Sequence, residues 1–217
     1  MPKKVVKGIM LAVYAAMLAG ETVKQIVAFT AEGGYDLWMA PMHFSSTFYI
    51  TVGFVLLGGK RLKHIGQSVL LVSGLMLFAM IAFSPYSIFG AEPEDIFKSA
   101  DSIYGYFFHM AVILQLAVMI AGGEYKPKLY DPAIFAAFAL VYGCIAVPFS
   151  IKTQLNFANI LQFSALPFMD SIRENYGHAV YLIVYYLGVC AIGAAIIYVY
   201  YLLYRLFEKR KRRFRIN

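Results

Sequence analysis

Long apolar runs alternate with short charged stretches along the whole chain. A helix needs about 17–25 mostly apolar residues to cross the hydrocarbon core of a bilayer, which is about 30 Å thick. Six runs approach or exceed this length, so the pattern predicts an all-α fold: one polytopic membrane bundle of six transmembrane helices, occupying residues 1–217 as a single domain. The expected spans are about 8–31, 38–58, 67–83, 103–121, 132–148 and 178–207.

Residue signals refine two of these spans. Asp131 followed by Pro132 is typical of a helix start, because the carboxylate caps free backbone amides and proline suits the first helical position. The first run is expected to be a membrane span and not a cleavable signal peptide, because it is long and contains Glu21 and Lys24.

The composition agrees with a membrane protein. Hydrophobic residues make up 61% of the chain and charged residues 14%, whereas a soluble domain usually has about 25% charged residues. A globular core of this size cannot hide so much apolar surface, so lipid must cover part of it. The two cysteines, Cys144 and Cys190, lie inside apolar runs. We expect them to be small buried hydrophobic residues that form no disulfide.

Charge differs between the two sides of the predicted bundle. Most of the 19 lysines and arginines lie in the tails and in alternate loops, and the opposite loops are mainly acidic. Basic loops face the cytoplasm, so the sequence predicts a cell-membrane protein with both termini cytoplasmic. The net charge of +7 does not indicate nucleic-acid binding, because the basic residues flank the spans. The last basic run, EKRKRRFR, is typical of a stop-transfer anchor, with binding of anionic lipid as the alternative.

Several polar side chains fall inside the predicted spans. Counted at about 1.5 Å per residue, they lie roughly 7–15 Å from the outer span ends, Gln115 near the level of Glu21. Because ionisable groups at membrane depth usually face a bundle interior or a wet cavity, we expect a hydrated pocket open to the outside, with an apolar inner half. Interhelical hydrogen bonds that only hold the helices together are the alternative. The residues are Glu21, Lys24, His43, His109 and Gln115.

The segment PMHFSSTFYIT carries the most candidate chemistry. His43, Thr47 and Thr51 follow one another at a spacing of four, which would draw a polar stripe down one face of a helix. Ser45 would then face away from His43 and would need a base from another helix, for which His109 is the candidate. Thr47 competes with Ser45 as a nucleophile.

Three segments resemble a known family. PMHFSS, which contains His43 and Ser45, resembles the "PLHxC" signature that opens a transmembrane helix in YwaF-type bacterial integral membrane proteins. His109, in YGYFFHMAVI, is similar to that family's histidine after the acidic outer loop. TQLNFANILQFSALP resembles its "G-x-N-Y-x-x-L…P" segment, and Pro85 its proline after the third span. The resemblance covers roughly Glu21 to the end of the sixth span.

The resemblance implies lipid chemistry. A related eukaryotic branch, the transmembrane-protein-164 type, consists of lipid acyltransferases with a Cys/His pair. By position, the family's cysteine falls on Ser45 and its histidine on His109. Serine in place of cysteine departs from the signature, and a serine hydroxyl needs an effective base to react at neutral pH.

The first functional hypothesis is therefore a membrane-embedded lipid acyl hydrolase or acyltransferase with membrane lipid as its partner and substrate and no cofactor. An attacking hydroxyl, a general base and donors to the developing oxyanion are the parts it needs. The residues assigned to catalysis are Ser45, His109, His43 and Thr47, and those assigned to substrate binding are Glu21, Lys24, Gln115 and Asn156.

Two alternatives stay open. A non-enzymatic protein that binds or transports a small solute would use the same polar pocket, although the sequence has no repeated halves. A zinc site built from His43, His109, His178 and Glu21 lacks the tight ligand spacing of zinc motifs, so no metal is expected. The oligomeric state is left open.

Overall fold

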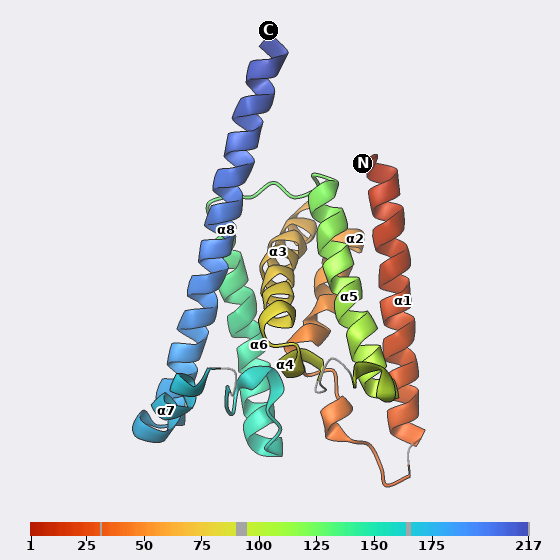
Figure 1. The fold of residues 1–217 in the computed structure, drawn as a ribbon, viewed down its shortest axis with the longest axis vertical. Coiled ribbons are helices and arrows are strands. Elements are labelled where there is room, and N and C mark those ends of the chain that lie inside the picture. Colours follow the sequence, from red (N-terminus) through yellow and green to blue (C-terminus); the bar gives the residue numbers. More distant parts are fainter. Residues whose placement is uncertain (31, 90–94, 164–165, 217) are drawn as a thin grey trace.

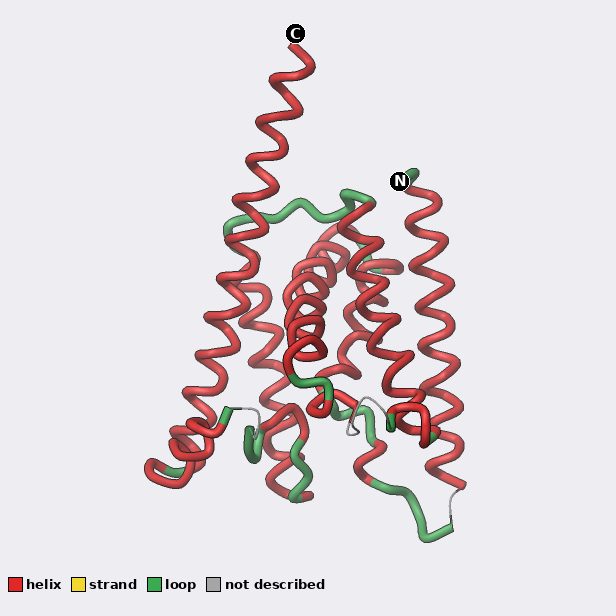
Figure 2. The backbone as a smooth tube through the Cα atoms, in the orientation of Figure 1, coloured by secondary structure: helices red, strands yellow, loops and turns green. Residues whose placement is uncertain are grey.

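A computed structural model describes residues 1–30, 32–89, 95–163 and 166–216, and its regular elements in these ranges are all helical (Figures 1 and 2). The long helices are α1 (Lys3–Thr30), α3 (Lys60–Phe83), α5 (Ala100–Ala121), α6 (Asp131–Thr153) and α8 (His178–Ile216). The short helices are α2 (Thr47–Leu57), α4 (Tyr86–Phe89) and α7 (Pro167–Tyr176), and the 3-10 turns are η1 (Leu37–Met39), η2 (Phe44–Ser46), η3 (Ile96–Lys98) and η4 (Phe157–Asn159).

The bundle has two distinct ends. Both chain termini lie at one end, which we name the termini end (Figure 1). The links from α1 to α2, from α3 to α5 and from α6 to α8 lie at the opposite end, which we name the loop end. The last turns of α8 project beyond the rest of the bundle at the termini end.

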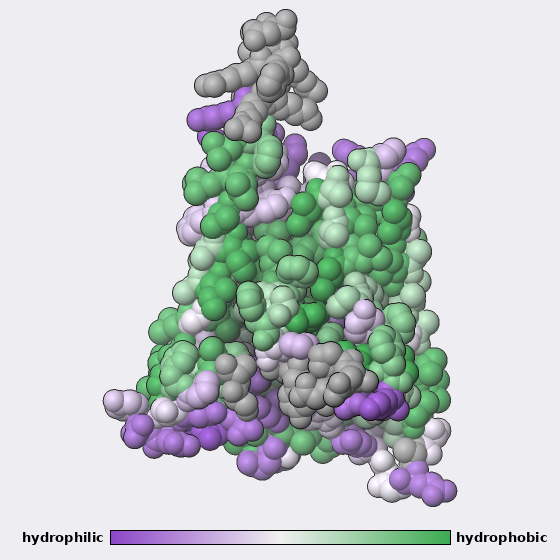
Figure 3. Space-filling model, in the orientation of Figure 1, coloured by the Kyte–Doolittle hydropathy of each residue, from purple (hydrophilic) through white to green (hydrophobic). Residues whose placement is uncertain are grey.

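The prediction of a multi-pass helical membrane protein is confirmed. Five helices of the described residues are long enough and apolar enough to cross a bilayer, namely α1, α3, α5, α6 and α8. The visible face has an apolar band between hydrophilic ends, as lipid contact requires (Figure 3). These five helices correspond to five of the six predicted spans, although residue 31, where the first was expected to end, lies outside the described part.

The second predicted span is not one continuous helix. Instead of a helix over 38–58, the chain forms η1, a turn over residues 40–43, η2 and then the 11-residue helix α2. The apolar helical stretch Phe44–Leu57 is only about 21 Å long at about 1.5 Å per residue, less than the hydrocarbon thickness of about 30 Å. Irregular backbone therefore completes this crossing at the loop end.

Other boundaries also differ from the prediction. Pro148 lies inside α6 and does not end it, since the helix continues to Thr153. Proline removes one backbone bond, but membrane helices tolerate this where neighbouring groups compensate. The helix α7 was not predicted. It begins at a proline in the first turn and ends before Gly177, whose φ of 87° suits a residue without a side chain.

The helix α3 is the centre of the bundle. Within its apolar window 56% of the residues are buried, compared with 17% in α1 and in α8. It packs against α2, α5, α6 and α8. The main core lies between α1, α2, α3 and α5, and a smaller cluster of Val72, Phe135 and Ile197 joins α3 to α6 and α8.

Both cysteines are free thiols, as expected, but Cys144 is exposed on α6 and Cys190 is half-buried. The prediction that both are buried was therefore wrong. In a membrane bundle an apolar run has no single inward face that its sequence marks, because lipid is as apolar as the core.

Candidate functional site

The irregular part of the second crossing is held in place by side chains. Non-helical backbone at membrane depth leaves carbonyl groups without helical partners, so it persists only where the protein or a wet cavity satisfies them. Three of these carbonyls accept hydrogen bonds from side chains of this segment, of α1 and of α6. The pairs are His43 Nε2 with Trp38 O (3.1 Å), Gln25 Nε2 with Met39 O (2.9 Å) and Tyr142 Oη with Met42 O (2.8 Å).

Glu21 is the centre of a hydrogen-bonded cluster beside this segment. Its Oε1 atom forms an ion pair with Lys24 Nζ at 3.0 Å and accepts a hydrogen bond from Gln25 Nε2 at 2.7 Å. Its Oε2 atom accepts hydrogen bonds from Tyr49 (3.0 Å) and Tyr104 (2.7 Å). Glu21 of α1, whose charge is balanced by Lys24, therefore joins α1 to α2 through Tyr49 and to α5 through Tyr104.

The loop after α1 extends this cluster. Tyr35 Oη donates to Gln25 Oε1 at 2.7 Å. Burial raises the pKa of Tyr35 above its ordinary value, so the phenol stays protonated and remains a donor. The Gln25 amide thus links three groups: its nitrogen donates to Glu21 and to the Met39 carbonyl of the broken segment, and its oxygen accepts from Tyr35.

A groove between α1 and α2 opens beside Glu21. Its volume is about 690 Å³, and its lining is mostly apolar. Leu18, Ile26 and Phe29 in this lining are large exposed hydrophobic residues, so the groove faces the lipid. A second hollow of about 430 Å³ continues along the same two helices, and Tyr49 borders both. The lining of the first is Leu18, Glu21, Thr22, Gln25, Ile26, Phe29, Thr30, Pro41 and Tyr49.

The structure brings His43 and His109 into the neighbourhood of this cluster. His43 lies in the broken crossing, whose Met39 carbonyl binds Gln25, and His109 lies on α5 five residues after Tyr104, which binds Glu21. Since a carbonyl only accepts, the bond from His43 Nε2 to Trp38 O leaves Nδ1 as the acceptor of that ring. His109 has the opposite tautomer, because its Nδ1 donates to Gly105 O at 2.6 Å and Nε2 keeps the lone pair.

The two candidate nucleophiles differ in their bonding. Thr47 Oγ1 donates to Phe44 O at 2.6 Å. Ser45, in η2, is half-buried, and its hydroxyl has no hydrogen-bond partner among the described residues. Of the two hydroxyls, that of Ser45 is the one without a local bond.

The expected polar stripe through this segment was wrong. His43 precedes the helix and is extended, with φ −63° and ψ 145°, so it shares no helical face with Thr47 and Thr51. For the same reason Ser45 and His43 do not lie on opposite faces of one regular helix, as was expected.

Gln115 does not lie at the level of Glu21, as was expected. Its amide donates to Met10 O at 2.8 Å, whereas Tyr104, on the same helix α5, binds Glu21. Met10 and Glu21 are about 16 Å apart along α1 at about 1.5 Å per residue. The estimate failed because α1 extends further than α5 at the loop end.

Asn156 belongs to a different part of the loop end. Its amide nitrogen donates to Gln162 O at 3.0 Å, and its amide oxygen accepts from Leu161 N at 2.8 Å and from Gln162 N at 3.3 Å. In this structure Asn156 therefore organises its own loop. This loop touches the broken crossing where Phe157 stacks on Trp38, with ring centroids 5.5 Å apart, and meets His43 edge-on.

The half of the bundle at the termini end, which was expected to be apolar, ends in a buried polar cluster. At the termini end Asp131 is fully buried, and its carboxylate accepts from Tyr125 and from the Lys128 amide and pairs with His64 at 2.7 Å. Sequence reasoning gave Asp131 only a capping role. Tyr49 and Tyr104 of the Glu21 cluster were also missed, although a tyrosine within a span indicates a hydroxyl that needs a partner.

The four groups considered for zinc do not form one site. His178 lines a separate cavity with Arg173 and Asn156, away from the groove that Glu21 lines. Within the described ranges no group of three or more His, Cys, Asp or Glu side chains could hold a metal ion.

The geometry is thus a polar cluster at the end of a lipid-facing groove, next to a broken membrane crossing. The resemblance to the YwaF-type family stays a prediction that rests on the residues quoted for it. No family model, curated protein or solved structure matches this chain.

Proposed function

We propose that the loop end binds a membrane amphiphile, with its polar part at the Glu21 cluster and its apolar tail in the groove between α1 and α2. The observation that carries this proposal is a charge-balanced polar cluster at the edge of a mostly apolar, lipid-facing groove. Because Lys24 neutralises Glu21, the polar part should be uncharged and hydrogen-bonding, such as a glycerol ester. The hollow beyond Tyr49 extends the room for the tail.

The test is lipid occupancy of the purified protein, measured by native mass spectrometry. Glu21→Gln removes a charged acceptor, which contributes about 1.5–3 kcal/mol to a hydrogen bond, so bound amphiphile should fall about tenfold or more. Glu32→Gln is the matched control, since Glu32 is exposed in the adjoining loop and should leave occupancy unchanged. Wild-type protein without bound amphiphile, or equal occupancy in both variants, would contradict the proposal.

A second candidate function is acyl transfer from a lipid ester bound in this groove. It is favoured by the tautomer of His109, whose Nε2 lone pair is left free by the bond to Gly105 O, and by the unbonded hydroxyl of Ser45. Ser45 Oγ would attack the ester carbonyl carbon while its proton passes to His109 Nε2. The alcohol then leaves with that proton, and water or a second alcohol releases the acyl group.

Labelling with a serine-reactive fluorophosphonate probe tests this candidate. Wild-type protein should be labelled, and labelling should disappear in Ser45→Ala and in His109→Ala. Ser46→Ala is the control, because Ser46 is the half-buried neighbour of Ser45 and should keep the signal. Labelling that survives in both of the first variants would exclude Ser45 chemistry and leave the binding function intact.

The proposed orientation puts the loop end outside the cell and both termini in the cytoplasm. It rests on the basic residues near the termini and on the common position of both termini in the bundle (Figure 1). A fluorescent protein that folds only in the cytoplasm should fluoresce when fused to the C-terminus. A dark fusion of full-length, membrane-inserted protein would reverse the orientation.

A further inference from the structure

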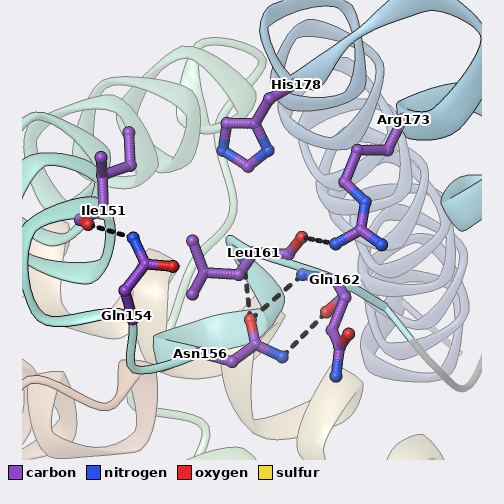
Figure 4. Close-up of a pocket in the computed structure, with 7 residues that line it drawn as sticks. All are labelled: Ile151, Gln154, Asn156, Leu161, Gln162, Arg173 and His178. Atoms are coloured by element: carbon purple, nitrogen blue, oxygen red, sulfur yellow. Dashed lines mark hydrogen bonds between the residues drawn. The ribbon is translucent and has the colours of Figure 1, made fainter.

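A separate cavity at the loop end, the one that His178 lines, lies between the end of α6, the following loop, α7 and the start of α8 (Figure 4). Its volume is about 480 Å³. It shares no lining residue with the groove beside Glu21, so it is independent of the function proposed above. Five of its seven lining residues are polar, and the lining consists of Ile151, Gln154, Asn156, Leu161, Gln162, Arg173 and His178.

Arg173 gives this cavity a positive charge. One guanidinium nitrogen, Nη1, donates to Leu161 O at 2.6 Å, which uses only part of the five N–H donors of the side chain. No carboxylate among the described residues lies within ion-pair distance of Arg173. The acid one turn earlier, Asp170, accepts a hydrogen bond from Phe163 N at 3.3 Å.

His178 adds a group that needs a partner. Its Nε2 atom is buried and has no hydrogen-bond partner among the described residues. The imidazole projects toward the space bordered by Leu161 and Arg173 (Figure 4). A buried polar atom left unpaired costs about 1–3 kcal/mol, so a bound acceptor would remove this cost.

The loop under the cavity is preformed. Ala158 and Asn159 have positive φ angles of 50° and 58°, which are unfavourable for residues with a side chain. Their carbonyls accept hydrogen bonds from Tyr185 (2.7 Å) and from Tyr181 of α8. Backbone strain of this kind persists where surrounding contacts impose it, and a preformed site loses less freedom when it binds a ligand.

We propose that this cavity binds a phosphate group, supplied by a phospholipid headgroup or by free phosphate. A phosphate presents several acceptor oxygens, which match the forked donors of an arginine and the N–H of an imidazole. The cavity is also at the right depth for a headgroup, because His178 is the first residue of the membrane-spanning helix α8. The site takes an anion, whereas the Glu21 cluster takes an uncharged group.

The single tryptophan of the chain provides the measurement. Trp38 stacks on Phe157, which follows the cavity residue Asn156, so an anion bound beside this preformed loop changes the electric field at the indole and with it the tryptophan fluorescence. Protein in a phosphate-free sugar detergent is titrated with inorganic phosphate or with monomeric dihexanoyl phosphatidylglycerol, against sodium chloride of equal ionic strength. A saturable change with the first ligand identifies free phosphate as the source, and a change only with the second identifies a headgroup.

Variants decide whether the cavity is responsible. Arg173→Gln should raise the half-saturating ligand concentration about tenfold or more, and His178→Ala should also weaken binding without touching the bond that Arg173 makes to Leu161. Lys152→Gln is the matched control, because Lys152 is exposed at the end of α6 and does not line the cavity. The proposal is overturned if wild type responds to neither ligand, or if Arg173→Gln and His178→Ala titrate like Lys152→Gln.

Discussion

At the termini end, Asp131 is fully buried and bound by three groups, whereas at the loop end Glu21 keeps 14% of its side chain exposed next to a groove. The partners of Asp131 come from α3 and from the α5–α6 link. Those of Glu21 come from α1, α2 and α5. Both carboxylates therefore tie helices together, but Asp131 borders none of the cavities named above and Glu21 does.

The backbone follows the same division. At the termini end the helices run regularly into short links, and a second pair, Lys63 with Glu124 at 2.6 Å, supports the contact between α3 and the α5–α6 link. At the loop end two irregular segments meet at the stack of Trp38 on Phe157. Regular backbone with paired charges gives stability, and irregular backbone beside cavities gives room for ligands. The termini end therefore contributes stability, and the loop end is the one for which binding is proposed.

The largest expected effect is at the termini end. Asp131→Ala leaves His64 and Tyr125 without their acceptor, and breaking a buried pair in this way costs about 3–5 kcal/mol. The free energy of unfolding, measured in mixed micelles of detergent and dodecyl sulfate, should fall by about that amount. Glu32→Ala removes an exposed carboxylate and serves as the control. A loss below about 1 kcal/mol for Asp131→Ala would break the comparison.

A smaller effect is expected where α2 rests on α3. A Cβ atom at Gly66 would lie 2.6 Å from Thr51 O and 2.9 Å from Phe54 Cβ, so Gly66→Ala must push the two helices apart. Overpacking of this kind costs about 1–3 kcal/mol. Because α2 also forms one wall of the groove, bound amphiphile should fall together with stability.

Gly188→Ala is the matched control for this substitution. A Cβ atom there meets nothing within 4 Å, and alanine is the better helix former, so neither stability nor occupancy should fall. If Gly66→Ala lowered stability but left occupancy unchanged, α2 would have to be removed from the description of the groove.

The five long helices could be predicted because lipid imposes one simple requirement, a run of about 20 apolar residues. An apolar run does not show, however, whether its backbone is one continuous helix. The segment around His43 lies inside an apolar run of spanning length, and its irregular backbone depends on Gln25 and Tyr142, which are distant in sequence. No local sequence pattern predicts hydrogen bonds to side chains of other helices.

The candidate site was predictable only in part, for a related reason. The ion pair of Glu21 with Lys24 follows from their spacing along α1, because residues three apart share a helical face. Matching depths between helices failed for Gln115, since the offset of α5 against α1 is set by packing and not by span ends. Tyr104 reaches Glu21 through that offset, and only the folded bundle reveals it.

The smallest expected effect concerns charges at the loop end that border no cavity. Lys98 and Asp95 form an ion pair whose side chains are 73% and 43% exposed. Exposed pairs contribute about 0–1 kcal/mol because water screens them, so Lys98→Gln should change the free energy of unfolding by less than about 0.5 kcal/mol. Amphiphile occupancy and the phosphate titration should also stay at wild-type values. If this variant impaired binding, general charge at the loop end and not the two defined cavities would control ligand access, and the assignment of binding to Glu21 and Arg173 would fail.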